Sequence, residues 1–312
     1  MAASIKSSLF DNNKSQHQKC IFVLGPTASG KSAWALEQAE KFQGSIINID
    51  SIQLYKDLLV GAAAPTLEEK ARVPHYLYSY VEAPQEMTAG DYLRDFYKLL
   101  ETDLRFPLFI VGGTGFYIQA LEKGMFNVES VPLEYRKVIE DELSLNGPEG
   151  LYAELKAKDP ASKIHINDHF RLVRAIEIIR YFDLVPSQLK EKAEDRKNVF
   201  PFSYIKLGFD FEKTIYQERV KKRTQKMINV GIVEETKKFY DLQLMDWAPL
   251  RSVGYKETME YLSFSRSPDW LTQAINQSTM QLIKKQKTWF KRDQTILWSN
   301  QEQRLEQFLS KV

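Results

Sequence analysis

The sequence has few of the residues that build disulfides and clustered metal sites. Its 312 residues include one cysteine, Cys20, and four histidines. A single cysteine excludes a disulfide within the chain and a zinc site of clustered cysteines and histidines. Cys20 opens an apolar run, so we expect a buried structural thiol in a protein of the reducing cytoplasm.

Long apolar runs and a strong charge imbalance are missing as well. No run approaches the length of a transmembrane helix, and residues 1–19 lack the apolar stretch of a signal peptide. We therefore expect a disordered tail at 1–19 and no membrane partner. The 43 Lys and Arg nearly balance the 41 Asp and Glu, so the net charge of +2 does not by itself indicate a nucleic-acid partner.

Basic residues nevertheless gather late in the chain, around residues 190–197, 219–226 and 284–292. Each group has two interpretations: a solvated helix face, which is the usual one, or a surface that binds phosphates. Because three such groups lie outside the first predicted strands, we give the two interpretations equal weight.

Short apolar runs alternate with helical segments in the first part of the chain. We predict buried strands at 20–24, 45–49 and 107–111, and helices at 31–42, 91–104 and 116–123. This alternation favours an α/β fold, in which helices cover both faces of a parallel sheet. Polar segments follow each strand at its carboxyl end, and that edge of such sheets binds ligands.

The pattern changes between residues 124 and 200. Strand-like runs disappear, and charged helical stretches replace them at 133–145, 151–157 and 170–182. The sheet pattern then returns, with a strand at 203–209, helices at 213–244 and 269–291, and a last strand at 295–298. We therefore predict a core formed by 20–123 and 201–312 and an inserted helical lobe at 124–200.

A phosphate-binding motif follows the first predicted strand. In the pattern G-x4-G-K-[ST], backbone N–H groups surround phosphate oxygens and the next helix adds its positive N-terminus. Lys31 would neutralise the terminal phosphates, and the Ser32 hydroxyl would hold Mg²⁺. Kinases and NTPases share the motif, so alone it predicts only that a polyphosphate binds to Gly25, Pro26, Thr27, Ala28, Ser29, Gly30, Lys31 and Ser32.

An acidic residue, Asp50, lies at the carboxyl end of the second predicted strand. In a doubly wound sheet this position is beside the phosphate loop. A carboxylate there can bind Mg²⁺, bind a ribose or take a proton from a nucleophile. It can equally cap a helix, because Asp50 followed by Ser51 is good capping chemistry.

Together with the phosphate loop, residues 50–55 (DSIQLY) and 112–117 (GGTGFY) resemble the signatures of tRNA dimethylallyltransferases. Further similar blocks follow in order at 164–168, 171–177, 252–257 and 284–291, with Arg219 and Arg223 between them. The resemblance spans roughly residues 21–298. Ordered blocks at this spacing are far more specific than the phosphate loop alone.

The resemblance implies a P-loop NTPase-like core and an inserted lobe that grips the tRNA anticodon stem-loop. The implied reaction moves a dimethylallyl group from dimethylallyl diphosphate to N6 of the adenosine 3′ of the anticodon, with Mg²⁺, and releases diphosphate. By position, Asp50 is the general base, Thr27 lies beside the reacting centre and Arg219 handles the diphosphate. We expect a monomer, with RNA contacts at Asp50, Ser51, Ile52, Gln53, Thr114, Arg136, Phe170, Arg171, Arg174, Arg251, Gly254, Tyr255, Lys256, Lys284 and Lys285.

An adenine in a stacked loop has to be flipped out before it can react. Aromatic side chains that stack on neighbouring bases would offset this cost. Tyr55, Phe116 and Tyr117 are candidates, although core packing is the more common role of an aromatic near a strand end.

The chain departs from the family pattern at several positions. Alanine stands at Ala62, where a hydroxyl residue is usual, and at Ala64, where a basic residue is usual. Ile52 and Met280 replace common arginines. The phosphate loop and Asp50 are intact, so we expect the chemistry to persist and RNA contacts to differ. Three alternatives stay open: a nucleotide or nucleoside kinase, an adenylate prenyltransferase acting on free AMP, and a tRNA-binding protein that has lost catalysis.

Overall fold

The computed structural model describes residues 18–124, 131–189, 200–298 and 301–310, so residues 1–17 of the predicted tail lie outside it. The chain divides into two compact units, one formed by Met1–Ile118 with Pro201–Val312 and the other by Gln119–Phe200. We call them the core unit and the helical unit. Lys19, predicted to lie in the tail, instead begins the first strand and is buried, because its ammonium group binds the Phe308 and Leu309 carbonyls.

A six-stranded parallel sheet forms the centre of the core unit, in the order β3-β2-β4-β1-β5-β6. Its pairings are all parallel, which confirms the predicted α/β fold class. The strands are β1 (Lys19–Leu24), β2 (Ser45–Asn48), β3 (His75–Tyr76), β4 (Leu108–Gly112), β5 (Ser203–Gly208) and β6 (Ile296–Leu297).

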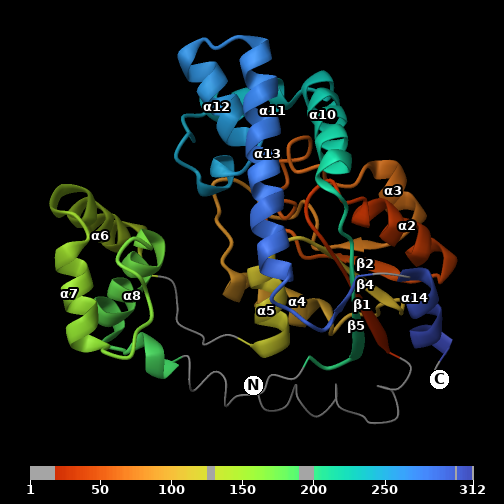
Figure 1. Ribbon diagram of the computed structural model, residues 1–312, viewed down its shortest axis with the longest axis horizontal. Helices are drawn as coiled ribbons and strands as arrows, with labels where there is room; N and C mark the ends of the chain where they lie inside the picture. Colours follow the sequence, from red (N-terminus) through yellow and green to blue (C-terminus); the bar gives the residue numbers. More distant parts are fainter. Residues whose placement is uncertain (1–17, 125–130, 190–199, 299–300, 311–312) are drawn as a thin grey trace. The chain divides into compact units, whose positions relative to one another are not determined.

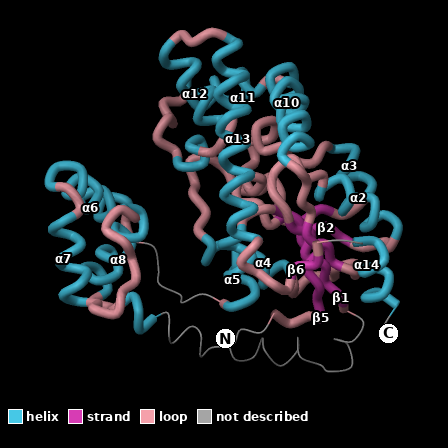
Figure 2. The backbone as a smooth tube through the Cα atoms, in the orientation of Figure 1, coloured by secondary structure: helices cyan, strands magenta, loops and turns pink. Residues whose placement is uncertain are grey.

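Helices cover the sheet: α2 and α14 lie on one side of the strands and α4 and α5 on the other (Figures 1 and 2). The helices of the core unit are α2 (Lys31–Lys41), α3 (Leu67–Arg72), α4 (Ala89–Leu99), α10 (Lys213–Val230), α11 (Ile232–Asp241), α12 (Tyr255–Phe264), α13 (Pro268–Phe290) and α14 (Gln301–Ser310), with α5 (Gly115–Lys123) at the boundary and a 3-10 turn at Ala248–Arg251.

The sheet is buried because its strands are apolar on both faces. All residues of β1 are buried, including Cys20, which confirms the predicted structural thiol. One cluster packs Ile21 and Val23 against Leu36 of α2 and Leu305 of α14. Burial of this kind is the main force that holds strands and helices together.

One predicted helix is in fact two. The expected helix at 213–244 breaks at Gly231, whose φ of +110° ends α10 and begins α11. Glycine adopts this left-handed backbone without the steric penalty that a side chain would add. The break turns α11 back beside α10, and this places Glu235 near the loop that follows β2.

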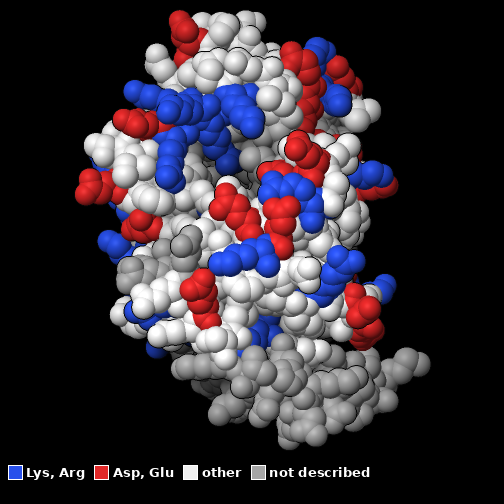
Figure 3. All heavy atoms as spheres, turned by 90° about the vertical axis from the view of Figure 1, so that its right-hand side faces the viewer, with Lys and Arg blue, Asp and Glu red and all other residues white. Residues whose placement is uncertain are grey.

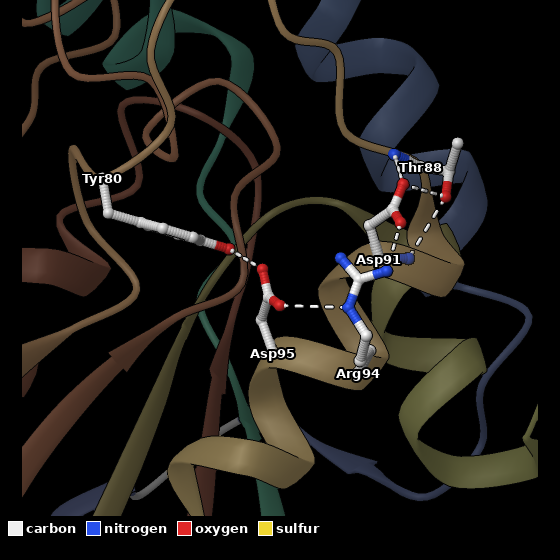
Figure 4. Close-up of polar contacts among 5 residues, drawn as sticks. All are labelled: Tyr80, Thr88, Asp91, Arg94 and Asp95. Carbon is white, nitrogen blue, oxygen red and sulfur yellow. Dashed lines mark hydrogen bonds and ion pairs between the residues drawn. The ribbon is translucent and has the colours of Figure 1, made fainter.

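The start of α4 is fixed by side chains (Figure 4). Thr88 and Asp91 form a reciprocal capping box, in which each side chain binds the other residue's backbone N–H. Arg94 pairs with Asp91 at 2.8 Å, and the Tyr80 hydroxyl donates to Asp95 at 2.8 Å. These contacts hold the segment after β3 against α4.

The helical unit has its own apolar core. The unit contains α6 (Leu133–Asn146), α7 (Glu149–Lys158) and α8 (His169–Phe182), whose bounds are close to those of the three helices predicted there. The buried cluster that these helices share includes Ile139, Leu151, Leu155, Leu172 and Ile176. None of the helices within the described ranges is long and apolar enough to cross a membrane.

Candidate active site

The phosphate loop occupies the turn between β1 and α2. Gly30 has a φ of +85°, and a side chain on Gly25 would collide with the Phe209 carbonyl, so both glycines are needed for this path. The Ser29 hydroxyl is buried and has no hydrogen-bond partner among the described residues. A concave loop with an unsatisfied donor, set at a helix N-terminus, fits a phosphate group.

Lys31 belongs to the same loop and is affected by two charges beside it. Burial lowers its pKa to about 8, nearby Asp50 raises that pKa and nearby Arg223 lowers it. Its ammonium group also donates to the Pro26 carbonyl at 3.2 Å. The lysine, the carboxylate and the guanidinium therefore meet at one strand-end edge.

The backbone around Asp50 is held by a buried asparagine, Asn48, which belongs to none of the motifs in the sequence. Its amide donates to the Asp50 and Leu77 carbonyls, each at 2.9 Å, and its oxygen accepts the Asp50 N–H at 2.8 Å. The Asp50 carboxylate also accepts the Ile52 N–H at 3.1 Å. In the sequence, the only sign of this role was a polar residue at the end of an otherwise apolar strand.

The Gly112–Gly113 turn brings the third predicted segment to the same edge. The Thr114 hydroxyl accepts the Ser51 N–H at 3.0 Å, so this segment supports the one that carries Asp50. Gln286 of α13 accepts the Thr27 N–H at 2.9 Å and donates to the Gly113 carbonyl at 3.2 Å. The Gln286 side chain thereby connects the phosphate loop to the turn after β4.

Two arginines one helical turn apart on α10 have different environments. Arg219 donates to the Ser29 carbonyl at 3.0 Å and lies over the Phe211 ring, with 4.2 Å between the guanidinium carbon and the ring centroid. Arg223 is desolvated, which lowers its pKa, and the charge of Asp50 raises that pKa. Arg219 thus supports the loop, whereas Arg223 lies with Lys31 and Asp50.

A clamp holds residues 59–64, the segment where the chain departs from the family pattern. The buried Glu235 carboxylate accepts backbone N–H groups of Leu59, Val60 and Gly61 at 2.9 to 3.2 Å. The Tyr255 hydroxyl donates to the same carboxylate at 2.5 Å. Only backbone atoms of the segment are gripped, so the clamp does not depend on the side chains at positions 62 and 64.

The clamp corrects part of the predicted RNA surface. Tyr255 is fully buried against Gly61, and Gly254 is buried beside Met227 and Ile232. Packing removes both from solvent, so neither the Tyr255 ring nor the backbone of Gly254 is accessible to RNA in this structure. Their neighbours Arg251 and Lys256 are exposed.

The other predicted RNA contacts divide between the units. Ser51, Ile52, Gln53 and Thr114 are half-buried near Asp50, and Gln53 donates to the Ala62 and Ala63 carbonyls. In the helical unit, Phe170 and Arg171 are exposed, whereas Arg136 and Arg174 are half-buried.

Basic side chains gather on the core unit too. Lys284 and Lys285 are exposed on α13. A band of Lys and Arg crosses the part of one face where α10 lies (Figure 3). Lys213, Lys221, Lys222 and Lys226 are the exposed lysines of that helix. Such a surface attracts nucleic-acid phosphates.

Two of the three candidate stacking aromatics are core residues. Tyr55 is 4% exposed and packs edge-on against Trp247, and Tyr117 is 5% exposed and stacks on Tyr92. For both rings the structure therefore shows core packing, the more common of the two roles expected. Phe116 is exposed, so base stacking stays a prediction for this ring.

The residues present fit a magnesium ion held mainly by phosphate oxygens. The Ser32 side chain is exposed at the first turn of α2. No cluster of three or more His, Cys, Asp or Glu suited to a metal occurs among the residues described. Mg²⁺ commonly takes one or two protein ligands, with substrate phosphates and water completing its shell.

The comparisons with known proteins agree with this geometry. A sequence profile described as IPP transferase matches residues 53–293, and one described as isopentenyl transferase matches 18–79. The chain is 46% identical over 282 residues to a tRNA dimethylallyltransferase of Bdellovibrio bacteriovorus, covering 89% of this chain and 92% of that protein. It is 35% identical over 302 residues to one of Geobacter metallireducens, covering 94% and 96%.

Solved structures give the same result. A tRNA isopentenylpyrophosphate transferase of Bacillus halodurans superposes with a TM-score of 0.64 at 25% identity, over 94% of each chain. A eukaryotic dimethylallyltransferase acting on tRNA shares the fold, with a TM-score of 0.73 at 24% identity, over 93% of this chain and 78% of that chain. With a profile match over most of its length and close relatives along nearly all of it, the chain belongs to the IPP transferase family.

Proposed function

We propose that this protein transfers a dimethylallyl group from dimethylallyl diphosphate to N6 of the adenosine 3′ of the anticodon in tRNA, releasing diphosphate. One observation carries the proposal: hydrogen bonds of Gln286 and Thr114 join the phosphate loop and the segment that carries Asp50 to the same turn after β4, so an anion-binding loop and a carboxylate lie at one edge of the sheet. Prenyl transfer to an amine needs both groups, the loop for the diphosphate and the carboxylate for the proton. The names of the relatives support the same reaction.

The reaction requires assistance both for the nucleophile and for the leaving group. The adenine amine is a weak nucleophile because its lone pair is delocalised into the ring. As its nitrogen bonds to C1 of the prenyl group, the C1–O bond breaks and its electrons pass to the diphosphate. Asp50 accepts the proton that the amine loses.

The leaving diphosphate gains negative charge as it departs. The N–H groups of the loop, Lys31 and Arg223 lie where they stabilise this charge. Arg219 acts through the loop, because its guanidinium binds the Ala28 and Ser29 carbonyls. Ser32 would hold Mg²⁺ together with the diphosphate, and the ion would supply further electrostatic stabilisation.

We assign tRNA binding to two surfaces. In the core unit, the segment from Asp50 to Gln53 with Thr114 approaches the target base, and Arg251, Lys256, Lys284 and Lys285 approach the backbone. In the helical unit, Phe170, Arg171, Arg174 and Arg136 grip the anticodon stem-loop. Their exposed arginines and aromatic ring suit phosphates and unstacked bases. We further propose that the protein works as a monomer in the cytoplasm, where a free thiol such as Cys20 stays reduced.

The direct test supplies the protein with Mg²⁺, labelled dimethylallyl diphosphate and unmodified tRNA. We expect label in the tRNA with the parent and almost none with Asp50→Ala. Asp50→Asn is the matched variant, because it preserves the side chain's size and removes its basicity. Label transfer that is unaffected by either change would refute the role of Asp50.

The same assay separates the alternatives. Phosphate transfer from ATP to a nucleoside without tRNA would favour a kinase. Label transferred to free AMP in preference to tRNA would favour an adenylate prenyltransferase. Tight tRNA binding without label transfer would indicate a binding protein that has lost catalysis.

A further inference from the structure

Helix α8 of the helical unit buries a carboxylate, Glu177, although its other buried residues are apolar. Its neighbours on α8, Ile176, Ile178 and Ile179, are all buried hydrophobics. The Glu177 side chain is 1% exposed. Burying a charge is costly unless a partner and hydrogen bonds compensate it.

The partners of Glu177 are two arginines from different helices. One oxygen, Oε2, lies 2.7 Å from a guanidinium nitrogen of Arg174 on α8 itself. The other, Oε1, lies 3.7 Å from Nε of Arg136 on α6 and has no hydrogen-bond partner among the described residues. The carboxylate therefore binds Arg174 directly and attracts Arg136 at longer range, while Nε of Arg136 donates to Glu140 on its own helix at 2.8 Å.

Those two arginines reach the surface next to an exposed aromatic ring. The side chains of Arg136 and Arg174 are 33% and 32% exposed. The Arg136 guanidinium carbon lies 5.5 Å from the centroid of the Phe170 ring, which is 70% exposed. Planar cations beside an open ring form a surface that suits an RNA backbone and an unstacked base.

We propose that Glu177 is a positioning residue for RNA binding, which orients Arg136 and Arg174 toward phosphates without touching the RNA itself. The inference rests on the proposed tRNA substrate. An anchored guanidinium loses less side-chain freedom when it binds a phosphate than a free one does. The buried carboxylate would thus preorganise two RNA-binding groups at once.

Net charge and positioning predict opposite changes in RNA affinity when Glu177 is replaced, so the two explanations can be separated by experiment. Removing a negative charge near phosphate-binding arginines should tighten RNA binding if only net charge matters. If Glu177 positions the arginines, Glu177→Gln should instead raise the Kd for an anticodon stem-loop about tenfold, the effect typical of removing a charge-assisted hydrogen bond. The slope of log Kd against log salt should fall by about one for each phosphate that the variant no longer binds.

Two further variants separate positioning from folding. Glu177→Asp keeps the charge but shortens the side chain, and we expect it to raise the Kd by about threefold. The matched control is Glu142→Gln, which removes a carboxylate that binds Arg180 instead. We expect it to leave the Kd unchanged or slightly lower.

The decisive comparison uses the double variant Arg136→Ala/Arg174→Ala as background. If Glu177 acts through these arginines, Glu177→Gln should cause no further loss of affinity there. An equal loss in that background would mark a structural effect and overturn the proposal. So would a Glu177→Gln variant that binds RNA as tightly as the parent or more tightly.

Failure of this inference is distinct from failure of the proposed function. A parent protein that neither binds nor prenylates tRNA would remove the function itself. A parent that does both, beside Glu177 variants with unchanged affinity and salt slope, would remove only the role of Glu177.

Discussion

Backbone groups hold the strand-end site of the core unit, whereas side-chain ion pairs hold the exposed surface of the helical unit. Near Asp50, the N–H groups of Thr27, Asp50 and Ser51 each donate to a side chain from another part of the site. In the helical unit, Glu177 and Glu140 hold the guanidinium groups instead. Backbone bonds therefore fix distances within the core site, while the long arginine side chains of the helical unit are oriented by the carboxylates with which they pair.

This contrast matches what each region has to do. Transferring a group between two bound reactants requires positions fixed to a fraction of an ångström, and a backbone network supplies that rigidity. Gripping a stem-loop requires positive charge that is oriented toward phosphates and an aromatic surface for unstacked bases. Substitutions in the core site should thus lower kcat, and substitutions in the helical unit should weaken tRNA binding.

After the loss of Asp50, the largest effect should come from Arg223→Ala. The guanidinium lies with Lys31 and Asp50, so its loss removes charge stabilisation from the leaving diphosphate. Removing one such group typically lowers kcat by about a hundredfold or more. Steady-state prenylation and separate tRNA-binding measurements should show a low kcat with nearly unchanged tRNA affinity.

Lys222→Ala is the matched control, because it removes the same charge from the exposed neighbour. We expect its kcat to stay within about twofold of the parent. If Arg223→Ala weakened tRNA binding and left kcat intact, the division between the two units would be wrong at this position.

A second effect should appear as lower stability when the clamp on residues 59–64 is broken. Glu235→Gln places an amide where several backbone N–H groups need acceptors, so donors are left unsatisfied. We expect the free energy of unfolding to fall by about 2 kcal/mol. Tyr255→Phe, which removes a hydroxyl that donates to Glu235 and accepts the Ala62 N–H, should lower it by about 1 kcal/mol.

Chemical denaturation of the parent and both variants measures these differences. Equal and negligible decreases would mean that the clamp contributes little to the core unit. A fall in kcat larger than the decrease in stability explains would show that the clamp also aligns the segment carrying Asp50.

The sequence predicted the parts of the site that are local and missed those that depend on distant packing. Residues 25–32 and Asp50 follow strands that their own apolar runs define, so their places could be predicted. Tyr255 could not be placed, because its burial depends on Gly61 and Glu235, which are far away in sequence. Gln286 and Asn48 act through hydrogen bonds to loop backbone atoms, and no local sequence pattern predicts which atoms a side chain will bind.

Element boundaries show the same limit. The helix at 91–104 is shorter than predicted, since α4 begins at Ala89 with its capping box and ends at Leu99. The strand at 75–76 and the helices α3, α12 and α14 were not predicted. β3 has only two residues and pairs with β2 across a sequence gap, so it carries too short a pattern to detect.

A smaller effect concerns pH and the core site. Because burial lowers the pKa of Lys31 to about 8, this residue is charged below that pH and increasingly neutral above it. A neutral lysine attracts the diphosphate less, so the KM for dimethylallyl diphosphate should rise above pH 8, by up to about tenfold per pH unit. Initial rates across this range, at saturating tRNA, measure the change.

Lys31→Arg keeps a positive charge at every pH tested and should show a flat KM in the same range. A parent KM that stays constant to high pH would mean that Lys31 remains charged, and that burial in the loop does not lower its pKa into this range.

The smallest effect should come from restoring a basic residue with Ala64→Lys. Position 64 lies in the clamped segment, where backbone bonds preserve the chain path whatever the side chain. A lysine there can extend along the surface and bind one more phosphate. We expect the tRNA Kd to fall by about threefold and the salt slope to rise by about one.

Leu67→Lys adds the same charge at a residue that is 87% exposed on the neighbouring helix α3. If this control tightened tRNA binding equally, the gain would reflect net charge and not the position. A gain confined to Ala64→Lys would sharpen the contrast between the units. It would mean that the core unit has given up an RNA-binding group here, so the helical unit supplies a larger share of the grip.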